Sequence, residues 1–297
     1  MAVIEVRDIH KRYGETVAVD GVSFDVDAGE IFGVLGRNGA GKTTTVEIIE
    51  GLRAPDTGRV RVLGLDPTRD RRALRAVLGV QLQEGTLPDK ATAGEMVRLY
   101  RSFYADGADP DRLLGELGLD DKRDTVVDEL SGGQLQRLSI ALALVGKPRV
   151  AVLDELTTGL DPRARRDTWE LIEQVRRAGV TILLVTHFMD EAQRLCDRIA
   201  VFDRGRIAAL DTPGGLVART HGRRGASLDE AFLAMTGTDD EGDGLDDVLG
   251  GAALDEDGRA RDGAASGGHR AVRDGAASGG PRRDGAPSDG ADGQVRS

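Results

Sequence analysis

One glycine-rich stretch of the chain has the residue types and spacing needed to hold a polyphosphate. The eight residues from Gly36 to Thr43 read GRNGAGKT. Glycines allow backbone conformations that direct consecutive N–H groups at phosphate oxygens, and Lys42 can place a mobile positive charge on the β- and γ-phosphates. The Thr43 hydroxyl is suited to Mg²⁺. The candidate phosphate-binding residues are Gly36, Asn38, Gly39, Gly41, Lys42, Thr43 and Thr44.

Two adjacent carboxylates, Asp154 and Glu155, directly follow the unbroken apolar run Val150–Leu153. Such a run predicts a strand that is covered on both faces, and ligands bind at the carboxyl ends of strands of this kind. Asp154 would then lie beside the Mg²⁺, and Glu155 could face the attacking water as general base. A solvated pair of carboxylates is the alternative, which the buried strand before them disfavours.

The apolar pattern around the glycine loop predicts the elements that hold it in place. Ile31–Leu35 is almost continuously apolar, as expected for a buried strand, and leads directly into the loop. Residues Thr44–Leu52 are expected to form a helix that is ended by Gly51 and Pro55. A strand, a glycine loop and a helix in this order are the context that a phosphate-binding loop requires, which argues against a chance match.

The rest of the pattern predicts two kinds of sheet. Between residues 22 and 26 apolar and polar residues alternate, which is typical of a half-exposed strand in an antiparallel sheet. Strand character returns at Val150–Leu153 and at Val180–Val185, each after a helical stretch, which is typical of parallel α/β architecture. Ile199–Phe202 and Arg206–Leu210 are expected to form a closing hairpin.

A long segment between the two groups of chemical residues has helical character. From about residue 84 to residue 145, apolar residues such as Met96, Leu99 and Phe103 fall at the 3.6-residue spacing of a helix. We interpret this segment as an inserted helical subdomain. The expected fold class is α/β: a phosphate-loop ATPase core with a mixed sheet, N-terminal antiparallel strands and the inserted helical subdomain.

The character of the chain changes after Gly237. Aromatic residues are absent there, Gly, Asp, Ala and Ser dominate, and fourteen acidic residues stand against seven basic ones. A segment of this composition cannot bury enough apolar surface to offset the entropy of ordering it. We predict an ordered nucleotide-binding domain over residues 1–236 and a disordered tail, rich in Gly, Asp and Ala, over residues 237–297.

Composition argues against several classes of protein. The 297 residues carry a net charge of −11 without clustered positive charge, so direct binding of nucleic acid is not expected. The single cysteine, Cys196, excludes an internal disulfide and is expected to be a buried thiol. No apolar run reaches the roughly 18 residues of a membrane-spanning helix. We expect a soluble intracellular protein, or one that a partner holds at a membrane.

The segment Leu130–Gln134, which reads LSGGQ, lies between the two nucleotide motifs. Together the three motifs resemble those of the ATPases of ABC transporters, and the resemblance covers roughly Val3–Leu233. In that family two domains pack head to tail and enclose two ATP molecules. The resemblance implies that Ser131 and Gly133 contact the γ-phosphate bound by the partner's loop. Ser is also a favoured helix N-cap, and the two roles are compatible because a helix start attracts anions.

The same resemblance assigns two more side chains to the nucleotide. Gln83 matches the glutamine that reaches Mg²⁺ or the attacking water and links the core to the helical subdomain, with Gln81 as the alternative. His187 matches the switch histidine that holds the γ-phosphate and orients Glu155, although a lone histidine is more often structural. The implied cofactors are ATP and Mg²⁺, with the metal held by Thr43, Gln83 and Asp154.

Two further matches lie at the edges of the expected site. Asp161, in the sequence GLDP, matches the loop that lines the interface between the two ATPase domains, although these residues also read as a turn before a helix. Tyr13 matches the aromatic residue that stacks on adenine, with packing on the sheet as the alternative. Leu156 departs from the family, which usually has proline after the catalytic glutamate. The change restores a backbone N–H and loosens the chain at the following loop.

The resemblance implies an ATP-binding and hydrolysing subunit that powers a separate multi-span membrane permease. It would form a homodimer or pair with a homologous ATPase subunit, and lie at the cytoplasmic face of the cell membrane, with the permease docked near Gln83–Tyr104. The segments Thr186–Ala192 and Ser227–Gly237 resemble those of bacterial multidrug and antibiotic-resistance exporters. Export of a drug-like or antibiotic small molecule is therefore the expected function.

Two alternatives belong to other classes of protein. A soluble ABC ATPase could act on a nucleic-acid or ribosomal partner. Chromosome-type members, however, need long coiled coils between the motifs, whereas about ninety residues separate Lys42 from Ser131, and translation-type members carry two tandem domains. A nucleotide-binding module without hydrolysis is disfavoured by Glu155.

Overall fold

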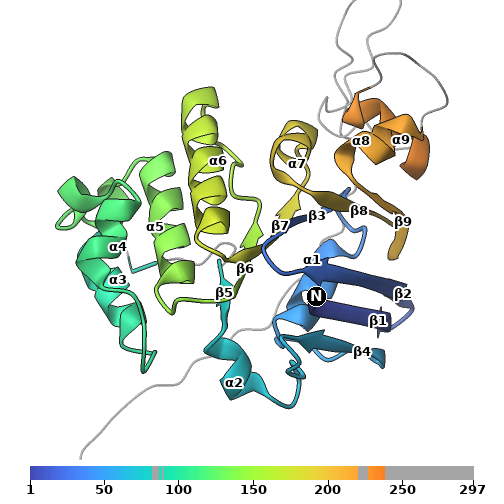
Figure 1. The fold of residues 1–297 in the computed structure, drawn as a ribbon, viewed down its shortest axis with the longest axis horizontal. Helices are drawn as coiled ribbons and strands as arrows, with labels where there is room; N and C mark the ends of the chain where they lie inside the picture. Colours follow the sequence, from blue (N-terminus) through green and yellow to red (C-terminus); the bar gives the residue numbers. More distant parts are fainter. Residues whose placement is uncertain (82–86, 89, 220–226, 238–297) are drawn as a thin grey trace, which may run out of the picture. The chain divides into compact units, whose positions relative to one another are not determined.

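Two β-sheets organise the part of the chain that the computed structural model describes, which is residues 1–81, 87–88, 90–219 and 227–237 (Figure 1). Gln83 and the predicted tail beyond Gly237 lie outside these residues. The smaller sheet is antiparallel and has the order β2 (Thr16–Asp27), β1 (Ala2–Tyr13), β4 (Thr57–Val62). The larger sheet has the order β5 (Leu78–Val80), β6 (Val150–Asp154), β7 (Thr181–Thr186), β3 (Ile31–Gly36), β8 (Arg198–Asp203), β9 (Arg206–Asp211). Its strands run parallel except for β9, which forms the expected antiparallel hairpin with β8.

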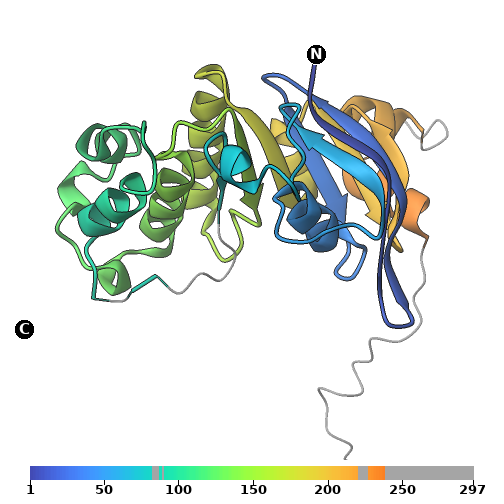
Figure 2. The ribbon, with the colours of Figure 1, turned by 90° about the horizontal axis from the view of Figure 1, so that it is seen from below.

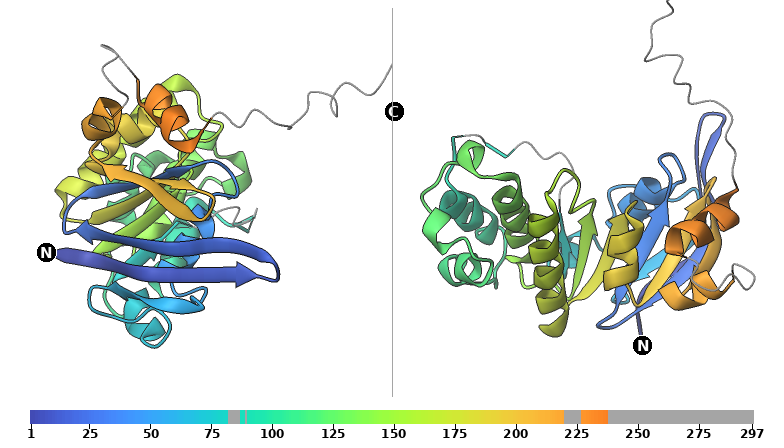
Figure 3. Two further views of the ribbon diagram at one scale, coloured as in Figure 1. Left: turned by 90° about the vertical axis from the view of Figure 1, so that its right-hand side faces the viewer. Right: turned by 90° about the horizontal axis from the view of Figure 1, so that it is seen from above.

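Alternation of side chains along the buried strands divides the core into two layers. In β6, Val152 packs toward α1 (Lys42–Ile49) and the smaller sheet, whereas Ala151 and Leu153 pack on the other face, toward α6 (Pro162–Arg177). Figure 3 shows the smaller sheet on the side of α1, with β2 beside β9. The central strands are therefore covered on both faces, as their unbroken apolar runs predict.

Three α-helices lie among the described residues between β5 and β6, where a helical subdomain was expected. They gather at one end of the larger sheet, and α5 packs against α6 (Figure 2). Their bounds are α3 (Ala93–Arg101), α4 (Pro110–Glu116) and α5 (Gly132–Leu144). The remaining described helices are α2 (Arg71–Arg75), α7 (Met189–Leu195), α8 (Pro213–Ala218), α9 (Leu228–Thr236) and two 3-10 turns at Asp120–Lys122 and Val127–Glu129. The expected α/β fold with an antiparallel N-terminal sheet and a helical insert is confirmed.

Local boundaries differ from the sequence-based expectation in three places. Helix α1 begins at Lys42 rather than Thr44, directly after its N-cap Gly41, and ends at Ile49 rather than Leu52. β1 and β2 are each twelve residues long, well beyond the short alternating run that predicted a strand. Helix α3 ends at Arg101, before Phe103, which the helical spacing includes. Met96 is buried as expected, but Leu99 and Phe103 are 48% and 68% exposed.

Two expectations from composition can be compared with the described residues. Cys196 is buried, as expected, and burial raises the pKa of its thiol. None of the described helices combines the length and the apolar character needed to cross a membrane.

Candidate nucleotide site

The glycine loop joins the end of β3 to the start of α1. Gly36 is the last residue of β3, and Gly41 is the N-cap of α1 with a φ of 96°. A side chain at Gly41 would place its Cβ 2.3 Å from the carbonyl oxygen of Ala18, so the close approach of β2 requires glycine at this position. The loop therefore leads directly into the positive end of a helix, where an anion is stabilised.

Lys42 is almost fully buried, with 6% of its surface exposed. Its Nζ donates hydrogen bonds to the carbonyl oxygens of Gly36 at 2.8 Å and of Arg37 at 3.0 Å. Burial lowers the pKa of the Lys42 amine, while the charges of Glu155 and Asp154 act in the opposite direction. The ammonium group of Lys42 thus reaches back to the start of the glycine loop, where two neutral carbonyl groups hold it.

Asp154 and Glu155 lie at the carboxyl end of β6, beside the neighbouring strand β7. The pKa of Asp154 is raised to about 6, first by burial and then by the charge of Glu155, against the opposing charges of Lys42 and His187. Glu155 has a φ of 47°, a left-handed conformation that costs a residue with a side chain roughly 1–3 kcal/mol. The chain therefore turns sharply at the residue expected to be the general base.

His187 follows β7 and meets Glu155 at the same edge of the sheet. Its Nδ1 lies 3.1 Å from Oε1 of Glu155, although 32 positions separate the two residues in the sequence. The contact follows from the topology, because β6 and β7 are parallel neighbours and Asp154 pairs with Val185. The structure thus brings together the proposed base and the histidine expected to orient it.

A hollow of about 470 Å³ opens where these groups meet. Tyr13, at the end of β1, borders it and is 42% exposed, with Lys11 and Arg53 carrying positive charge 5.7 and 5.5 Å from its ring centre. Sequence reasoning missed Thr16–Ala18, because their residue types give no sign that β2 passes close to the glycine loop. The lining residues are Tyr13, Thr16, Val17, Ala18, Asn38, Gly39, Gly41, Lys42, Thr43, Thr44, Asp154, Glu155 and Val185.

Ser131, Gly133 and Asp161 gather around a second hollow, of about 240 Å³, which shares no lining residue with the first. Ser131 is the N-cap of α5, as expected: its Oγ accepts the N–H of Gln134 at 3.3 Å, and the Gln134 side chain accepts the N–H of Ser131 at 2.9 Å. Asp161 is the N-cap of α6 and accepts two N–H groups of the first turn at 3.1 and 2.9 Å, which lower the pKa of its carboxyl. One chain therefore carries the Lys42 group and the Ser131 group on separate surfaces.

Known proteins that are similar to this chain share one family. A family model described as ABC transporter matches residues 19–158. The chain is 45% identical over 222 residues to the Nod factor export ATP-binding protein I of Paraburkholderia xenovorans, and the match covers 73% of each protein. This chain belongs to the ABC transporter ATP-binding family. A relative of the same name from Rhizobium etli is 41% identical over 222 residues and is covered to 70% of its length.

Solved structures of ABC proteins have the same fold as this ABC subunit. An ATP-binding subunit of an ABC transporter is 30% identical in sequence and superposes with a TM-score of 0.70. The match covers 78% of this chain and 99% of that one. A dimeric ATP-binding cassette in a post-hydrolysis state, bound to ADP and Pi, is 25% identical with a TM-score of 0.63, covering 70% of this chain and 98% of that one. The ABC subunit is thus a nucleotide-binding ATPase that serves a membrane permease.

Two residues of the ABC subunit bear on points that the family resemblance left open, the choice between Gln81 and Gln83 and the effect of Leu156. Gln81, the alternative to Gln83, accepts a hydrogen bond from the N–H of Asp154 at 3.2 Å through its Oε1, which ties this side chain to the end of β6. Leu156, in the place of the usual proline, is fully buried in the core and so anchors the chain directly after the left-handed Glu155. Gln83 itself lies outside the described residues.

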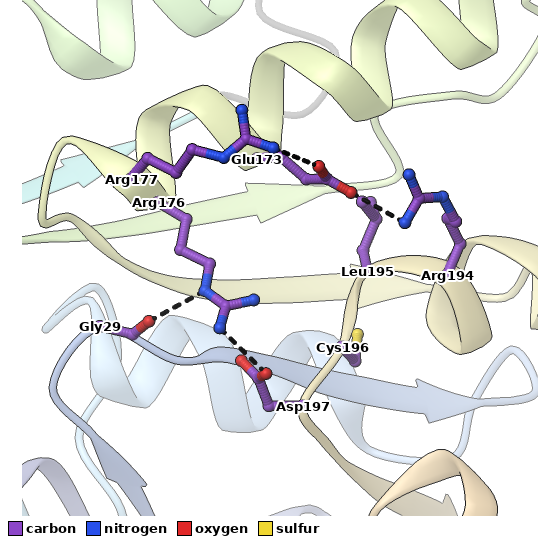
Figure 4. A pocket seen from close by; sticks show the side chains of 8 residues that line it. All are labelled: Gly29, Glu173, Arg176, Arg177, Arg194, Leu195, Cys196 and Asp197. Carbon is purple, nitrogen blue, oxygen red and sulfur yellow. Dashed lines mark hydrogen bonds and ion pairs between the residues drawn. The ribbon is translucent and has the colours of Figure 1, made fainter.

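The ABC subunit has a third hollow, of about 480 Å³, at the amino ends of the parallel strands (Figure 4). Glu173 pairs there with Arg177 and with Arg194, at 2.9 Å in each case. Arg176 pairs with Asp197 at 3.2 Å and also donates to a backbone carbonyl. Every charged side chain that lines this hollow has an ion-pair partner within it, so the arrangement fastens α6 to α7 and to the start of β8.

Proposed function

We propose that this chain binds Mg²⁺·ATP in the hollow at the glycine loop and hydrolyses it to drive export through a separate membrane permease. The observation that supports this most directly is the 3.1 Å contact between Glu155 and His187, at a hollow that Glu155 lines together with Lys42 and Asp154. A base, a group that orients it and a buried cation thus converge at the place proposed for the γ-phosphate.

In the proposed reaction Glu155 accepts a proton from the water that attacks the γ-phosphorus. The water oxygen bonds to phosphorus as the bond to the β–γ bridging oxygen breaks, which gives ADP and inorganic phosphate. His187 holds the Glu155 carboxylate in place through Nδ1. Lys42 exchanges its bonds to two loop carbonyls for bonds to phosphate oxygens, because an anionic acceptor makes the stronger hydrogen bond.

The donor set at this hollow fits Mg²⁺, which prefers oxygen ligands. We propose that the Thr43 hydroxyl and the Asp154 carboxylate, both in the lining, hold the ion together with Gln83. The pKa of Asp154 is raised to about 6, and a bound divalent cation favours the ionised form of such a carboxyl. The ion supplies positive charge that offsets the charge developing on the phosphates.

We propose that two such chains, or this chain and a homologous subunit, pack head to tail. Ser131, Gly133 and Asp161 lie in a hollow of their own, so a partner copy has to supply them to the nucleotide bound at Lys42. The Ser131 hydroxyl uses a lone pair for its cap and keeps its proton for a phosphate oxygen. A similar cassette that is dimeric and bound to ADP and Pi supports this arrangement.

For the permease we propose docking beside α3, at the cytoplasmic face of the membrane. Leu99 and Phe103 supply exposed apolar surface there, which is typical of protein contact sites. Relatives named for Nod factor export support export over a soluble role with nucleic acid or ribosomes. A drug-like or antibiotic cargo is proposed from the resemblance of Thr186–Ala192 and Ser227–Gly237. The ATPase domain is proposed to span residues 1–236, followed by a tail.

Glu155→Gln tests the hydrolytic part of this proposal. Glutamine keeps the size of the side chain but cannot take a proton, so ATP turnover should fall by about 10²–10⁴-fold while ATP still binds. Steady-state ATPase assays and binding of a fluorescent ATP analogue measure the two effects. Glu173→Gln, in the hollow of Figure 4, is the matched control and should turn over like the wild type. Unchanged turnover in Glu155→Gln would exclude this residue as the base.

Co-purification tests the transport part. The tagged chain is extracted from its native cells in mild detergent, and the proteins that accompany it are identified. A multi-span membrane protein in stoichiometric amount is the expected result. Recovery with ribosomes or DNA instead of such a protein would overturn the transport function and leave the ATPase assignment intact.

A further inference from the structure

A line of side-chain contacts runs from α6 to the His187–Glu155 pair. The ring of His187 lies 4.1 Å from the ring of Phe188 between centroids, with a tilt of 38° between their planes. The guanidinium carbon of Arg165 lies 4.7 Å from the centroid of the Phe188 ring. Arg165 is in the first turns of α6, four residues after the N-cap Asp161. The line therefore joins α6 to the turn that follows β7.

Phe188 and Arg165 are both fixed from elsewhere in the fold. Nη1 of Arg165 donates to Oδ2 of Asp190 at 3.3 Å, and 25% of the Arg165 side chain is exposed. The N–H of Phe188 donates to the hydroxyl of Thr186, which is fully buried at the end of β7, at 3.0 Å. The aromatic ring thus has an anchored backbone and a cation on its face, which is a favourable arrangement for an aromatic quadrupole.

His187 itself is less constrained than the residues beside it. Its side chain is 39% exposed, and the hydrogen bond to Glu155 joins it to a carboxylate that is itself 35% exposed. An exposed imidazole can populate several χ1 and χ2 rotamers, and only some of them place Nδ1 against Glu155. The neighbouring Phe188 ring, which is held in place, can restrict the rotamers that His187 adopts.

We propose that Arg165 and Phe188 are positioning residues that hold the His187 imidazole in the orientation in which Nδ1 meets Glu155. The proposal rests on the roles proposed above for Glu155 and His187 in hydrolysis. Phe188 supplies the surface against which the imidazole packs, and Arg165 holds that surface through its cation–π contact and its ion pair with Asp190. Contacts of this size shift a rotamer population by about threefold to tenfold.

Steady-state kinetics give the first test. Phe188→Leu should lower kcat by about three- to tenfold with little change in the KM for ATP, because the orientation of the imidazole affects the chemical step more than binding. Phe188→Tyr keeps the ring and should restore kcat. Arg165→Ala should lower kcat about threefold. Arg166→Ala, at the next and exposed position of α6, is the matched control and should match the wild type.

A double-mutant cycle separates positioning from simple packing of α6 on α7. In a His187→Ala background, Phe188→Leu should have no further effect on kcat, because no imidazole is left to orient. The same three- to tenfold loss in that background would overturn the proposal. If His187→Ala alone turns over like the wild type, the role of His187 in the proposed function fails instead, and the orientation of the imidazole is then decided spectroscopically.

The nitrogen chemical shift of Nδ1 gives that spectroscopic reading, independently of turnover. The chain has four histidines, so ¹⁵N-histidine labelling yields few signals, and His187→Ala assigns the one of interest. The His187 Nδ1 shift should move toward that of a solvent-exposed imidazole in Phe188→Leu and in Arg165→Ala. It should stay in place in Phe188→Tyr and Arg166→Ala. An unchanged signal in Arg165→Ala, a substitution at a partly exposed position, would overturn the proposal even if Phe188→Leu failed to fold.

Discussion

The parallel strands of the larger sheet have a hollow at each of their two ends, and the hollows are nearly equal in size. The hollow at the carboxyl ends, beside the glycine loop, measures about 470 Å³, and the one at the amino ends about 480 Å³. Charged side chains line both. In the hollow of Figure 4, each carboxylate pairs with at least one arginine of the same lining. At the glycine loop, Lys42 is bonded to two neutral carbonyls, while Asp154 and Glu155 place two carboxylates side by side.

The two hollows differ in the balance of their charges and not in volume or charge content, and this difference supports the proposal that the ligand binds at the glycine loop. Ion pairs near the surface are already satisfied within the protein and each contributes little. A buried ammonium group that is held by neutral dipoles gains much more when an anion replaces them. Likewise, the charge of Glu155 raises the pKa of Asp154 in spite of the opposing charges of Lys42 and His187, and a bound divalent cation would favour the ionised form of this carboxyl. These charges support the proposal that a phosphate and its metal ion bind at the glycine-loop end.

The largest effect that tests this contrast is expected from Lys42→Ala. Loss of a charge-assisted bond to phosphate costs about 1.5–3 kcal/mol, which would weaken ATP binding roughly 10- to 150-fold. Calorimetric titration with Mg²⁺·ATP measures the affinity. Arg177→Ala, at the opposite end, is the matched control and should bind ATP like the wild type. Normal affinity in Lys42→Ala would break the contrast, since the buried cation would then have no ligand.

A third carboxyl near the glycine loop, that of Glu50, makes the stability of this end of the sheet depend on pH. Glu50 is the C-cap of α1, and its pKa is raised to about 8 by burial and by the charges of Asp154 and Glu47. Its ordinary pKa is 4.5, so the unfolded chain releases this proton at a lower pH than the folded chain does. The folded state therefore binds the Glu50 proton more tightly than the unfolded state does. This preference stabilises the fold fully below pH 4.5, and the stabilisation is lost as the pH rises toward 8.

Glu50→Gln removes this titration while keeping the shape of the side chain. We expect the variant to gain stability over the wild type as the pH is raised from 5 to 8, by about 1–3 kcal/mol of unfolding free energy at pH 8. Chemical denaturation of the nucleotide-free protein at several pH values measures the difference. A stability difference that does not change with pH would contradict the raised pKa.

The smallest effect is expected at the opposite end, from Glu173→Gln. The substitution removes the carboxylate shared by Arg177 and Arg194, which are 71% and 57% exposed. Because exposed pairs are weak, the loss of stability should be about 0.5–1 kcal/mol, with ATP affinity and turnover unchanged. Urea denaturation and an ATPase assay check the two statements. A marked loss of turnover would show that this hollow also serves the reaction.

The sequence located those site residues that have a reactive or phosphate-binding side chain or backbone and that directly follow an apolar run. The glycine loop follows β3, the pair Asp154 and Glu155 ends β6, and His187 follows β7. Parallel neighbouring strands end at the same edge of a sheet, so three segments far apart in the chain were expected at one site. The contact between His187 and Glu155 agrees with that reasoning.

Other features depend on contacts that no pattern in the sequence reveals. Thr16–Ala18 line the nucleotide hollow because β2 passes close to the loop, and Arg165 meets Phe188 only because α6 packs on α7. The apolar spacing from Met96 to Phe103 predicts a helix, but it does not show that α3 ends at Arg101 or which of its sides other elements cover. The left-handed conformation of Glu155 is likewise set by the turn around it and not by its residue type.

The helix and the proposed reaction place different requirements on the side chain at position 131, where Ser131 forms the capping box of α5. Asp caps a helix as well as Ser does, because both accept the N–H that Gln134 donates. The carboxylate, however, has no proton to offer and would bring a negative charge to the γ-phosphate of a partner. A population that was selected only for stable, abundant protein would accumulate such a substitution unnoticed. Under the proposed reaction, selection on turnover would restrict this site more tightly than the requirements of the helix do.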